Sequence, residues 1–248
     1  MSNLRFYSAE YLQIGASVKL SDNAAAHATR VLRLEISDEI ILFNGDGHDY
    51  TCAITSIKAK SKNSEVFAIV KSFVKITNES PLNITLLQGI SSGDRMDYTI
   101  QKAVELGVRN IVPINTSRSV VKLSAERAEK RLAHWQSVVH AACEQSGRAF
   151  VPQVAAPLSL SAWLASSPHQ NSTRILLNPI GALRLAELPK PMSSIELLIG
   201  AEGGLSQAEI DTAVSQGFQS IVLGARILRT ETAALTAIAA LQTLWGDF

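Results

Sequence analysis

Hydrophobic and polar positions follow two different patterns along the chain. In residues 4–75 the apolar positions recur in short runs, separated by turn-forming residues such as Asn44-Gly45-Asp46-Gly47. These runs predict strands at residues 4–8, 39–43, 49–57 and 64–74. Residues 23–32 instead have alanine, valine and leucine at helical spacing, which predicts one inserted helix. Closely spaced strands joined by turns predict a small β-barrel.

Beyond a polar linker at residues 76–82, runs with strand character alternate with runs of helical period. The predicted strands are residues 83–89, 110–114, 174–177, 195–199 and 220–223. The predicted helices are residues 94–106, residues 124–146, one that begins at Ser206, and residues 232–245. We therefore place the first domain at residues 1–75 and the second at residues 83–248. Alternating strands and helices predict an α/β fold with a largely parallel sheet in the second domain.

Local signals predict where these helices begin and end. Asp94 is suited to cap the helix at 94–106, and Gly107 to end it in the left-handed conformation. Ser206 and Glu209 have the spacing of a capping box. Thr230 or Thr232 is expected to cap the last helix. That helix is apolar on nearly every side, which predicts burial in the core or against another subunit.

Composition narrows the possible functions. The chain has 248 residues and a net charge of +1, which argues against a general nucleic-acid coat protein. In residues 95–148, nine basic residues stand against five acidic ones, so we expect a polyanion to contact this segment. Cys52 and Cys143 lack the spacing of a metal or disulfide motif. No signal peptide or long apolar stretch is recognisable, which predicts a cytoplasmic protein without a membrane span.

The glycine-rich segment Gly200-Ala201-Glu202-Gly203-Gly204 lies between a predicted strand and the capped helix. No Lys-Ser/Thr pair follows the glycines, and GxGxxG spacing is absent, so neither a phosphate loop nor a dinucleotide fingerprint is indicated. A nucleoside without phosphates fits a turn at the carboxyl end of a strand, where glycine lets a ligand approach the backbone. The alternative is a tight strand-to-helix turn with no ligand.

Two arginines lie in the loop that precedes the last helix. Arg226 and Arg229, beside a helix amino terminus, are suited to bind an anion or a polarised oxygen. A single loop arginine is otherwise usually solvated.

Several segments, in this order, resemble the RsmE family of SPOUT-class RNA methyltransferases, and the resemblance covers nearly the whole chain. They are Gly89-Ile90-Ser91, Asp94-Arg95-Met96, Lys102 with Glu105-Leu106-Gly107-Val108, Arg118-Ser119, His134-Trp135, Ala142 with Glu144-Gln145-Ser146-Gly147-Arg148, residues 200–206 and residues 223–233. Three positions depart from the family pattern: Ala201 replaces proline, Leu205 replaces phenylalanine, and Ser92 stands where lysine is frequent. The changes at Ala201 and Leu205 affect the rigidity of the glycine-rich loop, and the change at Ser92 affects one expected RNA contact.

The resemblance implies a PUA-like RNA-binding β-barrel at residues 1–75. For residues 83–248 it implies a SPOUT α/β domain with a deep trefoil knot, in a homodimer whose interface includes the last helix. Because true knots are rare, the sequence pattern alone would predict an open sheet. The implied activity is S-adenosylmethionine-dependent methylation of N3 of a uridine in the decoding region of 16S ribosomal RNA. The implied partner is that RNA or the small ribosomal subunit, and no metal is required.

The resemblance also implies that the cofactor lies among three loops. Their residues are Leu177, Asn178, Pro179, Gly200, Ala201, Glu202, Gly203, Gly204, Leu223, Gly224, Ile227, Leu228, Thr230 and Thr232. Methylation of an imide nitrogen requires loss of its proton, for which we expect Glu202 or a water as the acceptor. It also requires stabilisation of the negative charge that develops, for which we expect Arg229. The residues expected to dock RNA phosphates are Arg5, Arg30 and Arg33 in the first domain, with Arg118 and Arg148 in the second.

Three other functions fit parts of this pattern. One is a SPOUT methyltransferase that acts on a ribose 2′-hydroxyl. Another is a ribosome assembly factor that binds without catalysis, against which the intact Arg229-Thr230-Glu231-Thr232 argues. The third is a nucleoside-binding regulator, which the basic bias of residues 95–148 disfavours.

Overall fold

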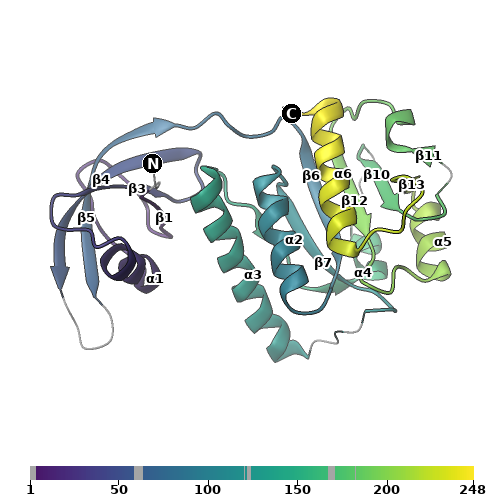
Figure 1. The fold of residues 1–248 in the computed structure, drawn as a ribbon, viewed down its shortest axis with the longest axis horizontal. Coiled ribbons are helices and arrows are strands. Elements are labelled where there is room, and N and C mark those ends of the chain that lie inside the picture. The colour runs from purple at the N-terminus through teal and green to yellow at the C-terminus, as the bar shows by residue number, and fades with distance from the viewer. Residues whose placement is uncertain (1–3, 59–63, 120, 122–123, 167–170, 182) are drawn as a thin grey trace. The chain divides into compact units, whose positions relative to one another are not determined.

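The computed structural model describes residues 4–58, 64–119, 121, 124–166, 171–181 and 183–248. Its chain divides into two compact units (Figure 1). Unit 1 contains residues 1–79 together with residues 140–151, and unit 2 contains residues 80–139 and 152–248. The sequence pattern places residues 140–151 in the second domain, whereas the structure groups them with the first. Unit 1 is therefore built from two separate parts of the chain.

Unit 1 contains a five-stranded sheet in the order β1-β3-β4-β5-β2. The strands are β1 (Arg5–Tyr7), β2 (Ser17–Lys19), β3 (Glu39–Phe43), β4 (His48–Lys58) and β5 (Glu65–Lys75). β1 pairs with β3 in parallel, and the other pairings are antiparallel. The four predicted strands are confirmed. β2 was missed because three residues are too few to show an alternation.

The predicted helix of unit 1 is confirmed, but it changes type part-way. α1 (Asp22–Ala26) continues directly into the π-helical turn η1 (His27–Val31). The Ser21 hydroxyl caps α1 by accepting a hydrogen bond from the backbone N–H of Ala24. Ala25 and Ala28 are buried in the core of the unit, where their small side chains let the helical segment pack closely.

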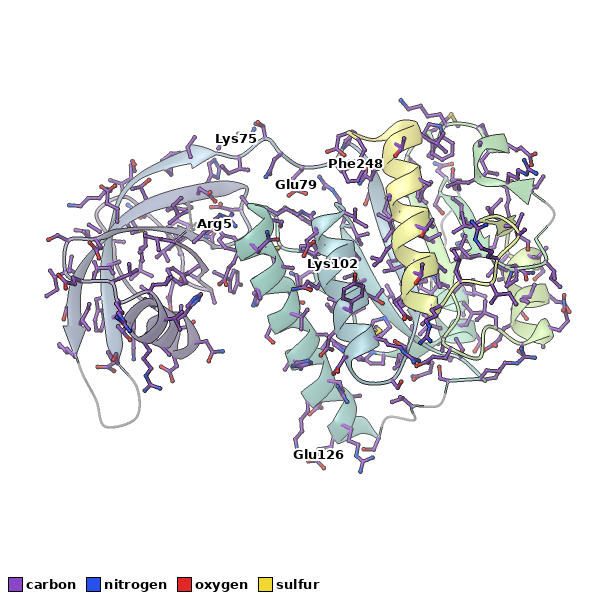
Figure 2. The ribbon with its side chains drawn as sticks, viewed as in Figure 1. Arg5, Lys75, Glu79, Lys102, Glu126 and Phe248 are labelled. Atoms are coloured by element: carbon purple, nitrogen blue, oxygen red, sulfur yellow. The ribbon has the colours of Figure 1, made fainter. Side chains whose placement is uncertain are left out.

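Arg5 joins the two parts of unit 1. Its side chain pairs with Asp49, with 2.7 Å between Nη2 and Oδ1, and Nη1 donates to the backbone oxygen of Cys143 over 2.6 Å. Nη2 also donates to the backbone oxygen of Arg148. Figure 2 labels the side chain of Arg5 in the fold. Because Arg5 is only 3% exposed and its donors are used inside the unit, the prediction that it docks RNA is wrong.

Arg148 has a similar internal role. It is 4% exposed, and its Nη2 lies 2.6 Å from Oε2 of Glu79 while its Nε donates to Oε1 of the same carboxylate. This two-point pairing is the geometry that arginine favours with carboxylates. The structure therefore also contradicts the predicted RNA contact of Arg148.

Unit 2 is built on one parallel sheet, as predicted. The strands are β6 (Asn83–Gly89), β7 (Asn110–Asn115), β8 (Gln153–Val154), β9 (Leu158–Ser159), β10 (Thr173–Leu177), β11 (Leu183–Arg184), β12 (Ser194–Ile199) and β13 (Gln219–Val222). Their order is β11-β13-β10-β12-β6-β7-β8, with β9 also paired to β7, and each pairing between them is parallel. The five strands predicted for this domain are confirmed. The short strands β8, β9 and β11 were missed.

The helices of unit 2 cover the sheet. They are α2 (Asp94–Glu105), α3 (Ala125–Ser146, whose last turns belong to unit 1), α4 (Leu160–Ser166), α5 (Gln207–Ser215), α6 (Thr230–Trp245) and the 3-10 turn η2 (Leu185–Glu187). α2 and α6 lie side by side against the sheet (Figure 1). Leucines of the central strands instead pack with α4 and α5 in a separate cluster that includes Leu87, Leu176 and Leu198. Burial on both faces explains why these strands are apolar throughout.

The predicted helix ends are partly confirmed. Ser206 and Glu209 form the capping box, and Gly107 has a φ of +85°. Asp94 does not cap α2, because Gly93 occupies the cap position. Neither predicted threonine caps α6, which begins two residues earlier than expected, with Arg229 at the cap position.

Both cysteines are free and buried. Burial raises the pKa of Cys52 to about 11 and that of Cys143 to about 12, so neither thiol is an activated nucleophile. Across the described ranges, no helix combines the length and apolar character needed to cross a membrane.

Candidate active site

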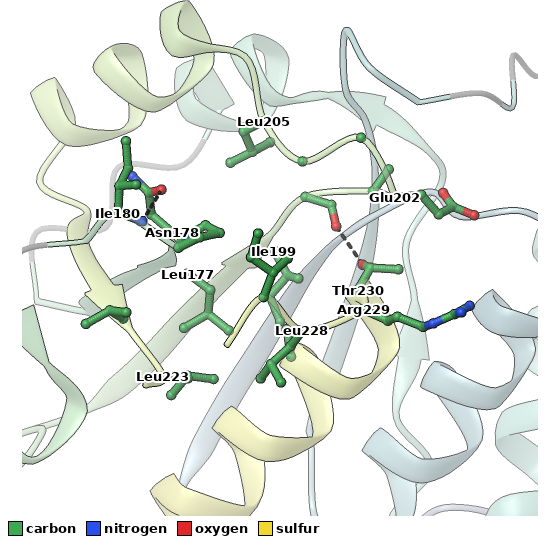
Figure 3. A pocket seen from close by; sticks show the side chains of 18 of the residues that line it. Leu177, Asn178, Ile180, Ile199, Glu202, Leu205, Leu223, Leu228, Arg229 and Thr230 are labelled. Atoms are coloured by element: carbon green, nitrogen blue, oxygen red, sulfur yellow. Dashed lines mark hydrogen bonds between the residues drawn. The ribbon is translucent and has the colours of Figure 1, made fainter. Parts of the chain in front are cut away.

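Three neighbouring strands of unit 2 end at one cavity of about 540 Å³. β10, β12 and β13 lie beside one another in parallel, so the segments that follow them leave from the same edge of the sheet. Those segments line the cavity with residues 177–180, 199–205, 221–224 and 226–231 (Figure 3). The sheet order thus brings together residues up to 54 positions apart in the sequence.

Nearly all of the residues predicted to bind the cofactor line this cavity. The exception is Thr232, which lies on the exposed side of α6 and is not among the lining residues. The cavity is also lined by residues that were not predicted to bind the cofactor: Ile180, Ile199, Leu205, Gln207, Ile210, Ile221, Val222, Glu231 and Ala233. Most of them flank the selected residues on the same strand ends, so extending each predicted loop by a few residues would have included them.

The cavity has an apolar part and a charged part. Leu177, Ile199, Leu223 and Leu228 gather in the middle of the close view, whereas Arg229 and Glu202 lie together on one side (Figure 3). Apolar walls with a few polar groups at one side are typical of sites for small organic ligands. An uncharged ring system is therefore suited to the leucine-lined part, and a reacting polar group to the other.

Glycines in this region are required by the chain's own packing. A Cβ on Gly200 would lie 2.7 Å from the carbonyl carbon of Gly204, and one on Gly89 would lie 2.6 Å from the carbonyl carbon of Gly200. Both distances are too short for non-bonded carbon atoms. The sequence alone suggests that the glycine turn admits a ligand, but at Gly200 and Gly89 the approach of the backbone to itself already accounts for glycine.

Glu202 connects the glycine turn to the loop before α2. Its Oε1 accepts hydrogen bonds from the backbone N–H and the hydroxyl of Ser92, and from Nη1 of Arg95. Partial burial raises the pKa of Glu202, but these hydrogen bonds lower it by more, so the net pKa lies below its ordinary value. In the structure Glu202 therefore holds the glycine turn against the loop before α2, and its role as a proton acceptor stays a prediction.

Glu209 connects the start of α5 to the loop after β7 in the same way. Its carboxylate accepts hydrogen bonds from the backbone and hydroxyl of Ser206 and from the backbone and hydroxyl of Ser117. Arg118, the next residue, donates through Nη1 to the backbone oxygen of Gly203 over 3.3 Å. Glu209 therefore also fixes the loop that brings Arg118 to the cavity.

Four arginines line the cavity: Arg95, Arg118, Arg226 and Arg229. Arg118, Arg226 and Arg229 are exposed. Arg229 stands at the amino terminus of α6, where the helix dipole adds to its positive charge. The structure thus brings Arg118 to the same cavity as Arg226 and Arg229, and it adds Arg95, which the sequence indicated only as part of a motif.

Arg30 and Arg33 belong to unit 1. Arg30 lies in η1, and Arg33 follows it with a φ of +55°. Both residues are exposed, so their side chains are accessible for contact with a polyanion.

The part of the chain that the structure describes contains no group of three or more acidic, histidine or cysteine side chains placed to hold a metal ion.

Comparison with known proteins identifies the family. Residues 78–242 match the model of the RNA methyltransferase domain, and residues 20–67 match that of the RNA methyltransferase PUA domain. The ribosomal RNA small subunit methyltransferase E of Buchnera aphidicola subsp. Schizaphis graminum is 36% identical over 98% of this chain and 97% of its own length. This chain belongs to the ribosomal RNA small subunit methyltransferase E family.

Another relative and two solved structures agree with this result. The protein of that name from Bacillus subtilis is 32% identical over 89% of each chain. The structure of the RsmE protein of Neisseria gonorrhoeae, bound to S-adenosyl methionine, superposes with a TM-score of 0.88 at 45% identity and covers 98% of both chains. A methyltransferase structure from Legionella pneumophila, also in complex with that cofactor, gives a TM-score of 0.92 at 36% identity over the full length of both chains.

Proposed function

We propose that this chain methylates 16S ribosomal RNA of the small ribosomal subunit, with S-adenosylmethionine as the methyl donor. The observation that carries the proposal is the cavity at the ends of β10, β12 and β13. It is lined by the loops implied by the family resemblance, in a chain similar over nearly its full length to relatives of that name and to a structure bound to S-adenosyl methionine.

At a finer level, we propose that the acceptor is N3 of a uridine in the decoding region. We also propose that unit 1 forms a PUA-like barrel, that unit 2 contains a deep trefoil knot, and that the enzyme acts as a cytoplasmic homodimer. These features are supported by the family resemblance and by the apolar character of α6.

The cavity is suited to the cofactor. Its volume of about 540 Å³ lies within the range of roughly 300–1,000 Å³ that is usual for small-molecule sites. Leu177, Leu223 and Leu228 would contact the adenine ring, and backbone groups of the glycine turn and of residues 223–228 would hold its polar atoms. When bound, the cofactor supplies a methyl group from a positively charged sulfonium.

Arg229 is the residue proposed to act on the RNA base. Replacing the N3 proton of uridine by a methyl group requires removal of that proton and leaves negative charge on the flanking carbonyl oxygens as the proton departs. The Arg229 guanidinium, exposed at the cavity and close to the helix amino terminus, is placed to stabilise that charge. Because Oε1 of Glu202 already accepts hydrogen bonds from Ser92 and Arg95, we assign the removal of the proton to water.

RNA docking is proposed for Arg30 and Arg33 of unit 1 and for Arg118 of unit 2. All three are exposed. Contacts between arginines and RNA phosphates release counterions from the RNA. The affinity of the protein for RNA should therefore fall steeply as the salt concentration rises.

The proposal is tested by incubating the protein with labelled S-adenosylmethionine and small ribosomal subunits from cells that lack it, followed by nucleoside analysis of the RNA. The expected product is N3-methyluridine. A methyl group on a ribose 2′-hydroxyl would refute the proposed acceptor atom but keep the enzyme class. Cofactor binding without transfer to any ribosomal RNA would refute the proposed activity and favour a role in assembly alone.

A further inference from the structure

A buried chain of hydrogen bonds connects the sheet to two of the cavity loops. Gln88, near the end of β6, is 0% exposed, and its Nε2 donates to Oγ1 of Thr230 over 2.8 Å. The Thr230 hydroxyl donates in turn to the backbone oxygen of Gly200 over 2.6 Å (Figure 3). Gln88 Nε2 also donates to the backbone oxygen of Gly89, which fixes the orientation of the amide. The chain therefore runs in one direction, from Gln88 through Thr230 to Gly200.

Two members of this chain, Gly200 and Thr230, belong to different loops of the cavity. Gly200 begins the glycine turn, and Thr230 follows Arg229 directly. Thr230 is 6% exposed, and its hydroxyl is used between Gln88 and Gly200. Its side chain thus fixes one loop to another, which differs from the cofactor contact implied by the family resemblance.

Gln88 is unusual for its place in the fold. Its neighbours Leu86 and Leu87 are fully buried leucines, and its own Oε1 has no hydrogen-bond partner among the residues that the structure describes. Burying an amide in an apolar sheet is unfavourable unless its hydrogen bonds compensate. An apolar side chain would fill the same space, so packing alone does not account for glutamine at this position.

We infer that Gln88 is a positioning residue that, through Thr230, sets the glycine turn in place relative to Arg229. The inference rests on the function proposed above. Without the chain, the Gly200 carbonyl loses its hydrogen-bond donor and the first turn of α6 loses its hydrogen bond to β6. Both the cofactor loops and the charge-stabilising arginine then become less well ordered before the ligand binds.

The test compares four variants of the full-length protein. Thr230→Val keeps the shape of the side chain but removes the hydroxyl, and Thr230→Ser keeps the hydroxyl. Gln88→Met keeps the length but removes the amide. Thr243→Val makes the same chemical change on the exposed side of α6, where the hydroxyl donates to the backbone oxygen of Ala239. Each variant is measured below its unfolding temperature, so that only folded protein is compared.

Three quantities are measured: hydrogen exchange of the backbone amides of residues 201–204 without ligand, affinity for S-adenosylmethionine by calorimetry, and methyl transfer to small ribosomal subunits. We expect Thr230→Val and Gln88→Met to speed exchange in the glycine turn and to weaken binding about tenfold, the effect of losing one buried hydrogen bond. Both variants should lower kcat and leave KM for the ribosomal subunit unchanged. Thr230→Ser should keep the slow exchange of the glycine turn, and Thr243→Val should behave like the wild type.

The variant Gln88→Met/Thr230→Val decides whether the two residues act together. If the two residues form one chain, the double variant should bind S-adenosylmethionine as tightly as the single variant with the lower affinity. Its loss of affinity should not be the product of the two single losses. Unchanged exchange in the glycine turn, or losses that multiply, would overturn the inference. Since exchange is measured without ligand or RNA, this outcome is distinct from failure of the proposed function, which would appear as a wild-type protein that transfers no methyl group.

Discussion

At the scale of single residues, the surroundings of each arginine determine its role. Arg5 and Arg148 are buried and pair with carboxylates and backbone oxygens of unit 1. Arg33 and Arg229 are exposed. The sequence shows the positive charge of all four alike, because the partners of the buried pair lie 44 and 69 positions away. Only contacts made by folding separate structural arginines from those accessible to RNA.

Replacing Arg229 by alanine should abolish most of the methyl transfer. Loss of one group that stabilises developing charge typically reduces kcat about 100-fold or more, whereas the apolar contacts of the cavity remain. We therefore expect Arg229→Ala to bind S-adenosylmethionine as the wild type does, measured by calorimetry, and to be strongly impaired in single-turnover methylation. Methylation at a near-normal rate would refute the assigned role, and a defect confined to RNA affinity would make Arg229 a docking residue.

Arg5→Met should change the stability of the protein, whereas Arg33→Ala should change its affinity for RNA. Arg5→Met leaves the Asp49 carboxylate in the interior without its cation, which should lower the free energy of unfolding by about 3–5 kcal/mol. Arg33→Ala should leave urea unfolding unchanged but weaken RNA binding and reduce its salt dependence by about one phosphate contact. A stable Arg5→Met variant with a selective loss of RNA affinity would restore the interpretation that the structure contradicts.

At the scale of elements, two carboxylates fix the loops around the glycine turn. Glu202 binds the residues before α2, and Glu209 binds the loop after β7. Strand β6 lies between β12 and β7 in the sheet, which is why the loops after β6 and β7 reach this segment. Both connections depend on ionised carboxylates that accept several hydrogen bonds.

The stabilisation from Glu209 should depend on pH. Burial raises the pKa of Glu209, but hydrogen bonds from Ser206 and Ser117 lower it by a larger amount. The pKa in the folded protein therefore lies below the ordinary value of 4.5. A group with a lowered folded pKa contributes fully above the unfolded pKa and loses that contribution as the pH falls through the folded value. The difference in thermal midpoint between the wild type and Glu209→Gln should therefore be largest near neutral pH and shrink below pH 4.5.

The control for this measurement is Glu126→Gln. Glu126 pairs with Lys130 on the surface of α3 and is exposed, so its replacement should change the thermal midpoint little at any pH. If the Glu209→Gln difference stayed constant from neutral pH to about pH 3, the hydrogen bonds to Ser117 and Ser206 would not depend on the ionised form, and the assignment would be wrong.

At the scale of the whole molecule, unit 1 is not a continuous piece of chain. Arg5 needs the backbone oxygens of Cys143 and Arg148, and Glu79 pairs with Arg148. A fragment of residues 1–79 lacks these partners and should unfold at lower urea concentration than unit 1 does in the full chain, as followed by circular dichroism. A cooperative transition of the fragment at the same midpoint would show that residues 140–151 contribute little to the unit.

The sequence by itself determined the elements and the chemistry of the site. Regular apolar periods predicted the longer strands and helices within a few residues, because one buried face imposes its own spacing. Ser206 and Glu209 marked the start of α5, because a capping box involves only neighbouring residues. The segments around Gly200 and Arg229 are recognisable from their residue types and order, and the family resemblance supplies nearly all of the lining residues proposed for the cofactor.

Tertiary structure alone decided which residues act on one another. The ends of β10, β12 and β13 form one cavity because the strand order differs from the sequence order. The roles of Thr230 as a link between loops, of Glu202 as a hydrogen-bond acceptor, and of Arg5 as an internal ion-pair partner depend on residues 30 to 143 positions away. Local sequence patterns indicate which face of an element is buried, but they do not identify a distant partner. That partner determines the protonation, the exposure and the function of the side chain.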